Sequence, residues 1–168
     1  MKHLYFCRHG QSVLNFQQTY AGQTNTPLTD LGRRQAKLAA EHAKGLHIDL
    51  IVSSPLSRTL ETAQIIAEIL HYPTGDIITN DIFKERALGL LEGKPFSTGP
   101  EDSILFPDIE SEAAVLTRAQ EGLRYLQSLE AETVLLVGHG SFVRALQTAI
   151  DPSREYPEPP NAHIIKLI

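Results

Sequence analysis

Short apolar runs alternate along this chain with segments of helical periodicity, and this alternation restricts the possible folds more than any other feature. The apolar runs cover residues 4–6, 49–52, 77–79, 133–137 and 163–167. Apolar residues recur every three or four positions in the intervening segments 29–45, 56–70 and 111–129. Strands joined by helices run parallel, and the helices cover both faces of their sheet. We therefore predict an α/β fold with a mostly parallel central sheet and the last run at an edge.

The helical segments also predict their own ends and buried faces. Thr29 is expected to cap the first helix and Ser111 the third, because a hydroxyl at this position accepts a free backbone N–H. Ser54 is expected to cap the second helix, with Pro55 at its first position. The face of the first helix expected to turn inward carries Leu31, Leu38, Ala39 and Ala43.

Length and composition restrict the class of protein. A chain of 168 residues is expected to form one domain, residues 1–168. No apolar run approaches the roughly 20 residues needed to cross a bilayer, and Lys2 precedes a short strand instead of a signal peptide. The single cysteine excludes an internal disulfide and favours a cytoplasmic protein. The net charge of −5 argues against a nucleic-acid partner, although a few arginines can still bind a small anion.

Two histidines follow two of the apolar runs. His9 and His139 each come directly after a predicted strand and each precedes a glycine. Taken alone, such a turn is typical of an ordinary strand–helix loop. In a parallel sheet, however, both turns lie at the edge where ligands bind. Arg8 and Arg58 are placed to join them, because Arg58 falls in the first turn of a helix, where a cation is unfavourable unless an anion binds there.

The expected cluster favours phosphate chemistry. A guanidinium group can bind a phosphate through two parallel N–H···O hydrogen bonds. Neighbouring positive charge lowers the pKa of an imidazole, which keeps the imidazole neutral and hence nucleophilic. A carboxylic acid is needed to protonate the leaving oxygen, and Glu85, on the loop after the third strand, is the candidate. Arg86 either contacts substrate, forms a surface ion pair with Glu85 or belongs to the lid. The sequence has neither a phosphate-binding P-loop pattern nor a zinc-ligand pattern, so we expect no metal and no cofactor.

Five motifs in order resemble the histidine phosphatase superfamily, in the branch that includes cofactor-dependent phosphoglycerate mutase. They are Arg8-His9-Gly10-Gln11-Ser12 with Asn15, Pro27-Leu28-Thr29 with Gly32, Ser53-Ser54-Pro55-Leu56-Ser57-Arg58-Thr59 with Glu61-Thr62-Ala63, Glu85 with Gly89 and Glu92-Gly93, and Gly138-His139-Gly140. The match covers nearly the whole chain. It implies a three-layer α/β/α sandwich and metal-independent chemistry.

The resemblance also implies a role for each site residue. His9 matches the nucleophile that becomes phosphohistidine, and Glu85 matches the proton donor that later activates water. Arg8, Arg58 and His139 match the remainder of the phosphate pocket. The resemblance adds a second group of substrate contacts, formed by Asn15, Ala21, Gly22, Gln23 and the Gly140 amide.

The sequence favours a phosphatase over a mutase. Residues 95–112 form an irregular, acidic segment that we expect to act as a short lid. The mutases carry a lysine and a pair of arginines in this region, whereas no lysine or arginine stands between Lys94 and Arg118 here. They also carry a tyrosine where this chain has Leu88. A smaller lid leaves a phosphoenzyme open to water, so hydrolysis of a small phosphorylated substrate is expected.

Three alternatives remain open at this point. The first is phosphoglycerate mutase-type transfer, and the second is dephosphorylation of a phosphoprotein. The third, from another class, is a non-catalytic module that binds a phospho-ligand or a protein. Sequence does not define the organic half of the substrate, the pathway or the oligomeric state.

Overall fold

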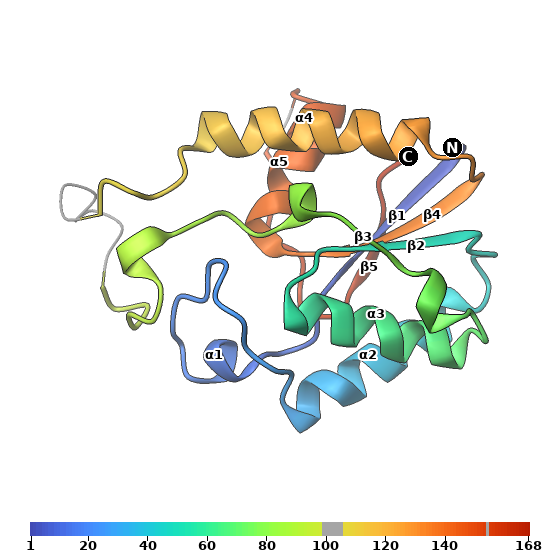
Figure 1. Ribbon diagram of the computed structural model, residues 1–168, viewed down its shortest axis with the longest axis horizontal. Coiled ribbons are helices and arrows are strands. Elements are labelled where there is room, and N and C mark those ends of the chain that lie inside the picture. Colours follow the sequence, from blue (N-terminus) through green and yellow to red (C-terminus); the bar gives the residue numbers. More distant parts are fainter. Residues whose placement is uncertain (99–105, 154) are drawn as a thin grey trace.

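A five-stranded sheet forms the centre of the computed structural model, which describes residues 1–98, 106–153 and 155–168 (Figure 1). The strands lie in the order β3-β2-β4-β1-β5. Their bounds are β1 (His3–Arg8), β2 (Leu50–Ser53), β3 (Ile78–Thr79), β4 (Thr133–Gly138) and β5 (Ile164–Lys166). All neighbouring strands run parallel except β5, which pairs antiparallel with β1 at the edge. The predicted mostly parallel sheet and the edge position of the last strand are confirmed.

Helices cover both faces of this sheet. α2 (Asp30–Ala43) and α3 (Ser57–Ile69) pack on one face, and α4 (Glu112–Ser128) and α5 (Gly140–Ile150) pack on the other (Figure 1). The shorter elements are α1 (Val13–Phe16), η1 (Thr74–Asp76), η2 (Asp81–Phe83) and η3 (Gly89–Leu91). The three-layer α/β/α arrangement predicted from the sequence is therefore confirmed.

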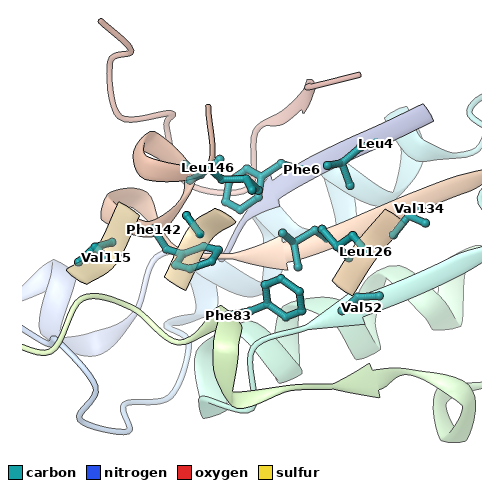
Figure 2. Close-up of a cluster of buried hydrophobic side chains, with 12 residues drawn as sticks. Leu4, Phe6, Val52, Phe83, Val115, Leu126, Val134, Phe142 and Leu146 are labelled. Atoms are coloured by element: carbon teal, nitrogen blue, oxygen red, sulfur yellow. The ribbon is translucent and has the colours of Figure 1, made fainter. Parts of the chain in front are cut away.

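Alternate residues of each central strand supply the two cores. On the α4–α5 side, Phe6 and Leu136 pack with Phe83 and Phe142 in a fully buried cluster (Figure 2). On the α2–α3 side, Cys7 and other strand residues pack against alanines and isoleucines of the two helices. Burial raises the pKa of the Cys7 thiol to about 12, which suits a packing role.

Two of the predicted helix starts are confirmed and one is wrong. The Thr29 hydroxyl accepts the Gly32 N–H at the start of α2, and the Ser111 hydroxyl accepts the Ala114 N–H at the start of α4. The third prediction fails because α3 begins at Ser57, after Leu56. The Ser54 side chain lies ahead of the helix and contacts His139 instead.

The predicted inward face of α2 is wrong at its two leucines. Leu31 is 42% exposed and Leu38 is 65% exposed, whereas Ala39 and Ala43 are buried as expected. The buried face consists of small residues, namely Gly32, Ala36, Ala39, Ala40 and Ala43. Small side chains let the helix backbone approach its neighbours closely, so the leucines face solvent.

The predicted lid, residues 95–112, is only partly described, because residues 99–105 lie outside the described residues. Its described parts supply Phe96, Phe106, Pro107 and Ile109 to the wall of the cavity discussed below. Among the described residues, no helix is both long and apolar enough to cross a membrane.

Candidate active site

Strand register brings the two strand-end histidines together. β1 and β4 are neighbours, with Arg8 paired to Gly138, so the next residue of each chain segment emerges at the same sheet edge. The His9 N–H donates to the Gly138 carbonyl at 3.0 Å. The two imidazole rings lie 5.4 Å apart between centroids, edge to face. The convergence predicted from the two His-Gly turns is therefore present.

Hydrogen bonds define which nitrogen of His9 carries the lone pair. Its Nδ1 lies 2.7 Å from the Gly10 carbonyl oxygen, which can only accept, so Nδ1 carries the hydrogen. Nε2 then carries the lone pair, and it accepts from Nε of Arg58 at 3.3 Å. Burial, and after it the charge of Arg58, holds the pKa of His9 well below its ordinary value. The imidazole is therefore neutral at pH 7.

Arg58 is almost completely buried and is held from behind by backbone carbonyls. Its Nη1 donates to the Thr24 carbonyl at 3.0 Å and its Nη2 to the Gly22 carbonyl at 2.7 Å. These bonds leave Nε directed at His9. Burial lowers the pKa of Arg58 to about 10, which still leaves it charged at pH 7. Gly22 therefore positions a cation as well as lining the site.

His139 presents a buried nitrogen without a partner. Its Nε2 lies 2.9 Å from the Ser54 hydroxyl, and that hydroxyl already accepts the Leu56 N–H. This contact does not fix the tautomer, because a hydroxyl oxygen can accept two hydrogen bonds. Among the described residues, Nδ1 has no hydrogen-bond partner. In the tautomer in which Ser54 donates to Nε2, Nδ1 carries the hydrogen and can donate it to an anion.

Arg8 supplies a second buried donor of this kind. Its Nη1 donates to the Pro159 carbonyl at 2.8 Å, and its Nη2 is ion-paired with Glu158 at 2.6 Å. Its Nε is buried and, within the described part of the chain, has no partner. Buried donors are normally satisfied, so the two orphaned nitrogens of Arg8 and His139 indicate a place for a bound anion.

Glu85 lies at the amino end of α5. Its carboxylate accepts the N–H of Ser141 at 3.1 Å and of Phe142 at 3.0 Å, and the N–H of Arg86 at 2.8 Å. Burial nevertheless dominates and raises the pKa of Glu85. A carboxyl group with a raised pKa beside a cluster of cations can hold a proton and deliver it.

The loop that carries Glu85 is fastened by Arg118 of α4. The Arg118 guanidinium donates to the carbonyls of Ile82, Lys84 and Glu85 and is ion-paired with Glu110 at 2.8 Å. It also stacks over the Phe142 ring at 5.0 Å. Sequence reasoning did not identify Arg118, because a lone arginine on an amphipathic helix gives no signal of an inward contact.

A cavity of about 680 Å³ opens beside this site, and neither Arg118 nor the fully buried His139 is among the described residues that line it. Of the predicted residues, Arg8, His9, Asn15, Ala21, Gly22, Arg58, Glu85 and Arg86 line it. Gln23 lies behind the wall, where its side-chain amide donates to the Glu85 carbonyl at 2.9 Å. Gly140 is buried at the first position of α5. Arg86 lines the cavity, and its Nε donates to the Glu110 carbonyl at 2.6 Å.

Comparison with known proteins identifies the family. The profile of the histidine phosphatase superfamily (branch 1) matches residues 4–164. The chain belongs to this superfamily. It is 39% identical to the "uncharacterized phosphatase PhoE" of Bacillus subtilis (strain 168) over 146 residues, which cover 85% of this chain and 74% of PhoE. It is 33% identical to the "probable phosphoglycerate mutase GpmB" of Proteus mirabilis (strain HI4320) over 165 residues, covering 89% of this chain and 75% of GpmB.

A solved structure of the same superfamily has the same fold. A mycobacterial glucosyl-3-phosphoglycerate phosphatase, crystallised with VO3, superposes with a TM-score of 0.86 at 26% identity. The superposition covers 99% of this chain and 92% of that one. The superfamily thus places the chain among phosphatases and mutases, and it supports the resemblance found in the sequence motifs.

Proposed function

We propose that this chain is a phosphatase that hydrolyses a phosphomonoester through a phosphohistidine formed on Nε2 of His9. One observation carries the proposal. The lone pair of a neutral His9 faces the Arg58 guanidinium, while buried donors of Arg8 and His139 have no partner among the described residues. An electron-rich nucleophile surrounded by unpaired donors suits a phosphoryl group, whose oxygens need all of these bonds.

In the first half-reaction, Nε2 of His9 attacks phosphorus and the bond from phosphorus to the ester oxygen breaks. The hydrogen bond from Nδ1 to the Gly10 carbonyl stabilises the positive charge that develops on the ring. Arg8, Arg58 and His139 donate to the equatorial oxygens. Glu85 gives its proton to the leaving oxygen, and the alcohol departs.

In the second half-reaction, a water molecule attacks the phosphohistidine. Glu85, now a carboxylate, takes a proton from this water as the oxygen bonds to phosphorus. The bond between phosphorus and Nε2 breaks, inorganic phosphate leaves, and His9 is neutral again. Burial of Glu85 serves both halves because it keeps the proton affinity of the carboxyl group high.

The lining of the cavity favours hydrolysis of a simple monoester over a mutase reaction. A mutase must hold a carboxylate and a second phosphate, which requires additional cations. Beyond Arg8 and Arg58, the described lining holds one further cation, Arg86, and it includes the apolar and aromatic side chains of Tyr20, Leu88, Leu91, Phe96 and Phe106. We propose an uncharged organic group next to the phosphate. The phosphatase name of PhoE, a 39% identical relative, supports hydrolysis over mutase-type transfer.

The test is phosphate release from p-nitrophenyl phosphate and a panel of metabolite monophosphates, with EDTA present. We expect metal-independent turnover that is lost in His9→Ala and kept in the control His42→Ala, which changes an exposed histidine of α2. Quenching a labelled reaction into alkali, which preserves phosphorus–nitrogen bonds, should leave label on the wild-type chain alone. Full turnover by His9→Ala would refute the mechanism.

The same assay separates the competing functions. Absence of hydrolysis together with phosphoryl transfer on phosphoglycerate, primed with bisphosphoglycerate, would identify a mutase. Phosphate binding without either reaction would identify a binding module. Activity on a phosphopeptide but on no small monoester would identify a phosphoprotein phosphatase.

A further inference from the structure

Glu158 places a second carboxylate beside the proposed catalytic residues, and the proposed reaction does not use it. It belongs to the proline-rich segment that follows α5 and leads to β5, and it lines the same cavity as His9 and Glu85. One of its carboxylate oxygens lies 2.6 Å from Nη2 of Arg8. This ion pair engages a cation that the phosphoryl group also needs.

The same carboxylate also covers the start of α5. A side chain placed on Gly140, the first residue of that helix, would collide with the Glu158 carboxylate. The carboxylate therefore rests against the positive end of the helix dipole, where free N–H groups attract anions. Arg8 and the amino end of α5 are both parts of the predicted phosphate pocket. Glu158 is thus bound, as an anion, by the groups expected to bind substrate.

The surroundings allow Glu158 to leave while its backbone stays in place. The neighbouring Pro159 carbonyl accepts from Arg8, and the Asn161 side chain donates to the His9 carbonyl at 2.9 Å. These bonds hold the segment to the catalytic loop. The Glu158 side chain itself is 43% exposed, so it can rotate into solvent. A phosphoryl dianion that approaches Arg8 would repel the carboxylate in that direction.

We propose that Glu158 is an intramolecular competitor of phosphate, which gives up Arg8 and the start of α5 when substrate binds. It thereby sets the affinity of the site both for the substrate phosphoryl group and for the inorganic phosphate produced. This inference rests on the proposed function only for the identity of the ligand. A competitor weakens binding of both anions, whereas a residue that merely holds Arg8 in position would strengthen it.

The experiment measures the dissociation constant of inorganic phosphate by calorimetry, without turnover. We expect Glu158→Gln to bind phosphate at least about fivefold more tightly than wild type, the lower end of typical coupling between linked ligands. Glu155→Gln is the matched control, because it removes the same charge from the same segment at an exposed residue that lines a neighbouring cavity. Its affinity should stay within about twofold of wild type. Glu158→Ala repeats the test without the amide.

The direction in which phosphate affinity changes in the Glu158 variants decides whether the inference holds. Unchanged or weaker phosphate binding in both Glu158 variants, with thermal unfolding confirming that they are folded, would overturn the inference. An equal gain in Glu155→Gln would also overturn it, because the effect would then be one of net charge. Hydrolysis is scored separately on p-nitrophenyl phosphate, so tighter binding without turnover refutes only the proposed function.

Discussion

The contact between two glycines makes a quantitative prediction about the catalytic loop. Gly10 follows His9, and Gly32 lies in the first turn of α2. A Cβ on Gly32 would collide with the Gln11 carbonyl oxygen, and a Cβ on Gly10 would collide with the Gly32 carbonyl oxygen. The backbone of the loop that carries His9 therefore lies directly against α2. Replacing Gly32 by alanine must push that loop away by about 1 Å to restore an ordinary carbon–oxygen contact.

Two opposing effects give the expected cost in stability. Overpacking by one methyl group typically costs about 1–3 kcal/mol, because the backbone on the other side cannot rotate out of the way. Alanine also favours the helix by up to about 1 kcal/mol, and by less in the first turn. The net loss should be about 1–2 kcal/mol, which lowers the melting temperature of a chain of this size by roughly 3–6 °C. A displacement of about 1 Å at the reacting group should lower kcat about 100-fold.

The measurements are thermal unfolding by circular dichroism and turnover of p-nitrophenyl phosphate. Gly45→Ala is the matched control, because a Cβ at Gly45, just beyond α2, meets nothing within 4 Å. It should leave kcat unchanged and raise stability by up to about 1 kcal/mol. If Gly32→Ala loses stability but keeps kcat within about threefold of wild type, the glycine contact does not position His9. If it behaves like Gly45→Ala in both assays, the packing argument itself is wrong.

Three further predictions concern Glu85, the buried histidines and Arg118. Glu85→Gln should lower kcat about 10²–10⁴-fold on an alkyl phosphate, whose leaving oxygen needs a proton, and far less on p-nitrophenyl phosphate; equal losses on both would exclude Glu85 as the acid. Burial depresses the pKa of His9 and His139, so below about pH 6.5 the unfolded chain binds more protons and the free energy of unfolding should fall from pH 7 to pH 5.5. Urea titrations test this, and a flat profile would contradict it. Arg118→Met should cost about 2 kcal/mol or more and lower kcat more than it changes KM, since it frees the loop of Glu85; wild-type kcat would show that the loop holds without it.

The sheet and the core of the site could be predicted because both depend on local pattern. A continuous apolar run such as residues 133–137 can be satisfied only by burial on both faces, which β4 provides. Once the strands are parallel, His9 and His139 must emerge at the same edge of the sheet. The pairing of β1 with β4 then places the two residues side by side. The first-turn position of Arg58 likewise followed from helix periodicity.

The wrong predictions arose where a local sequence pattern was used to choose between possible contacts of a side chain. Leu31 and Leu38 looked more suited to the core than alanine, yet the spacing between α2 and its neighbours admits only small residues. Ser54 has a side chain suited to capping, but its hydroxyl lies against buried His139, 2.9 Å from Nε2. Neither the interhelical distance nor the contact with His139 can be obtained from local pattern.

The supporting charges were missed for a related reason. Arg118 reaches the Glu85 loop from α4, and Glu158 reaches Arg8 from a loop 150 residues later in the chain. Their spacing along the sequence carries no periodic signal, and their residue types are typical of solvated surface. Only the fold brings them to the sheet edge, so side chains that tune a site are harder to predict than those that lie at strand ends.

Two carboxylates meet the first turn of α5, and their surroundings suit them to opposite tasks. Glu85 is buried and accepts from Ser141 and Phe142, and burial raises its pKa, as a group that delivers a proton requires. Glu158 is half-exposed and paired with Arg8, as a group that must yield its place to phosphate requires. The proposed exchange of Glu158 for a phosphoryl group on Arg8 does not involve the bonds of Glu85 to the helix, because the Ser141 and Phe142 N–H groups hold Glu85. We therefore expect the proposed proton donor to stay in place during that exchange.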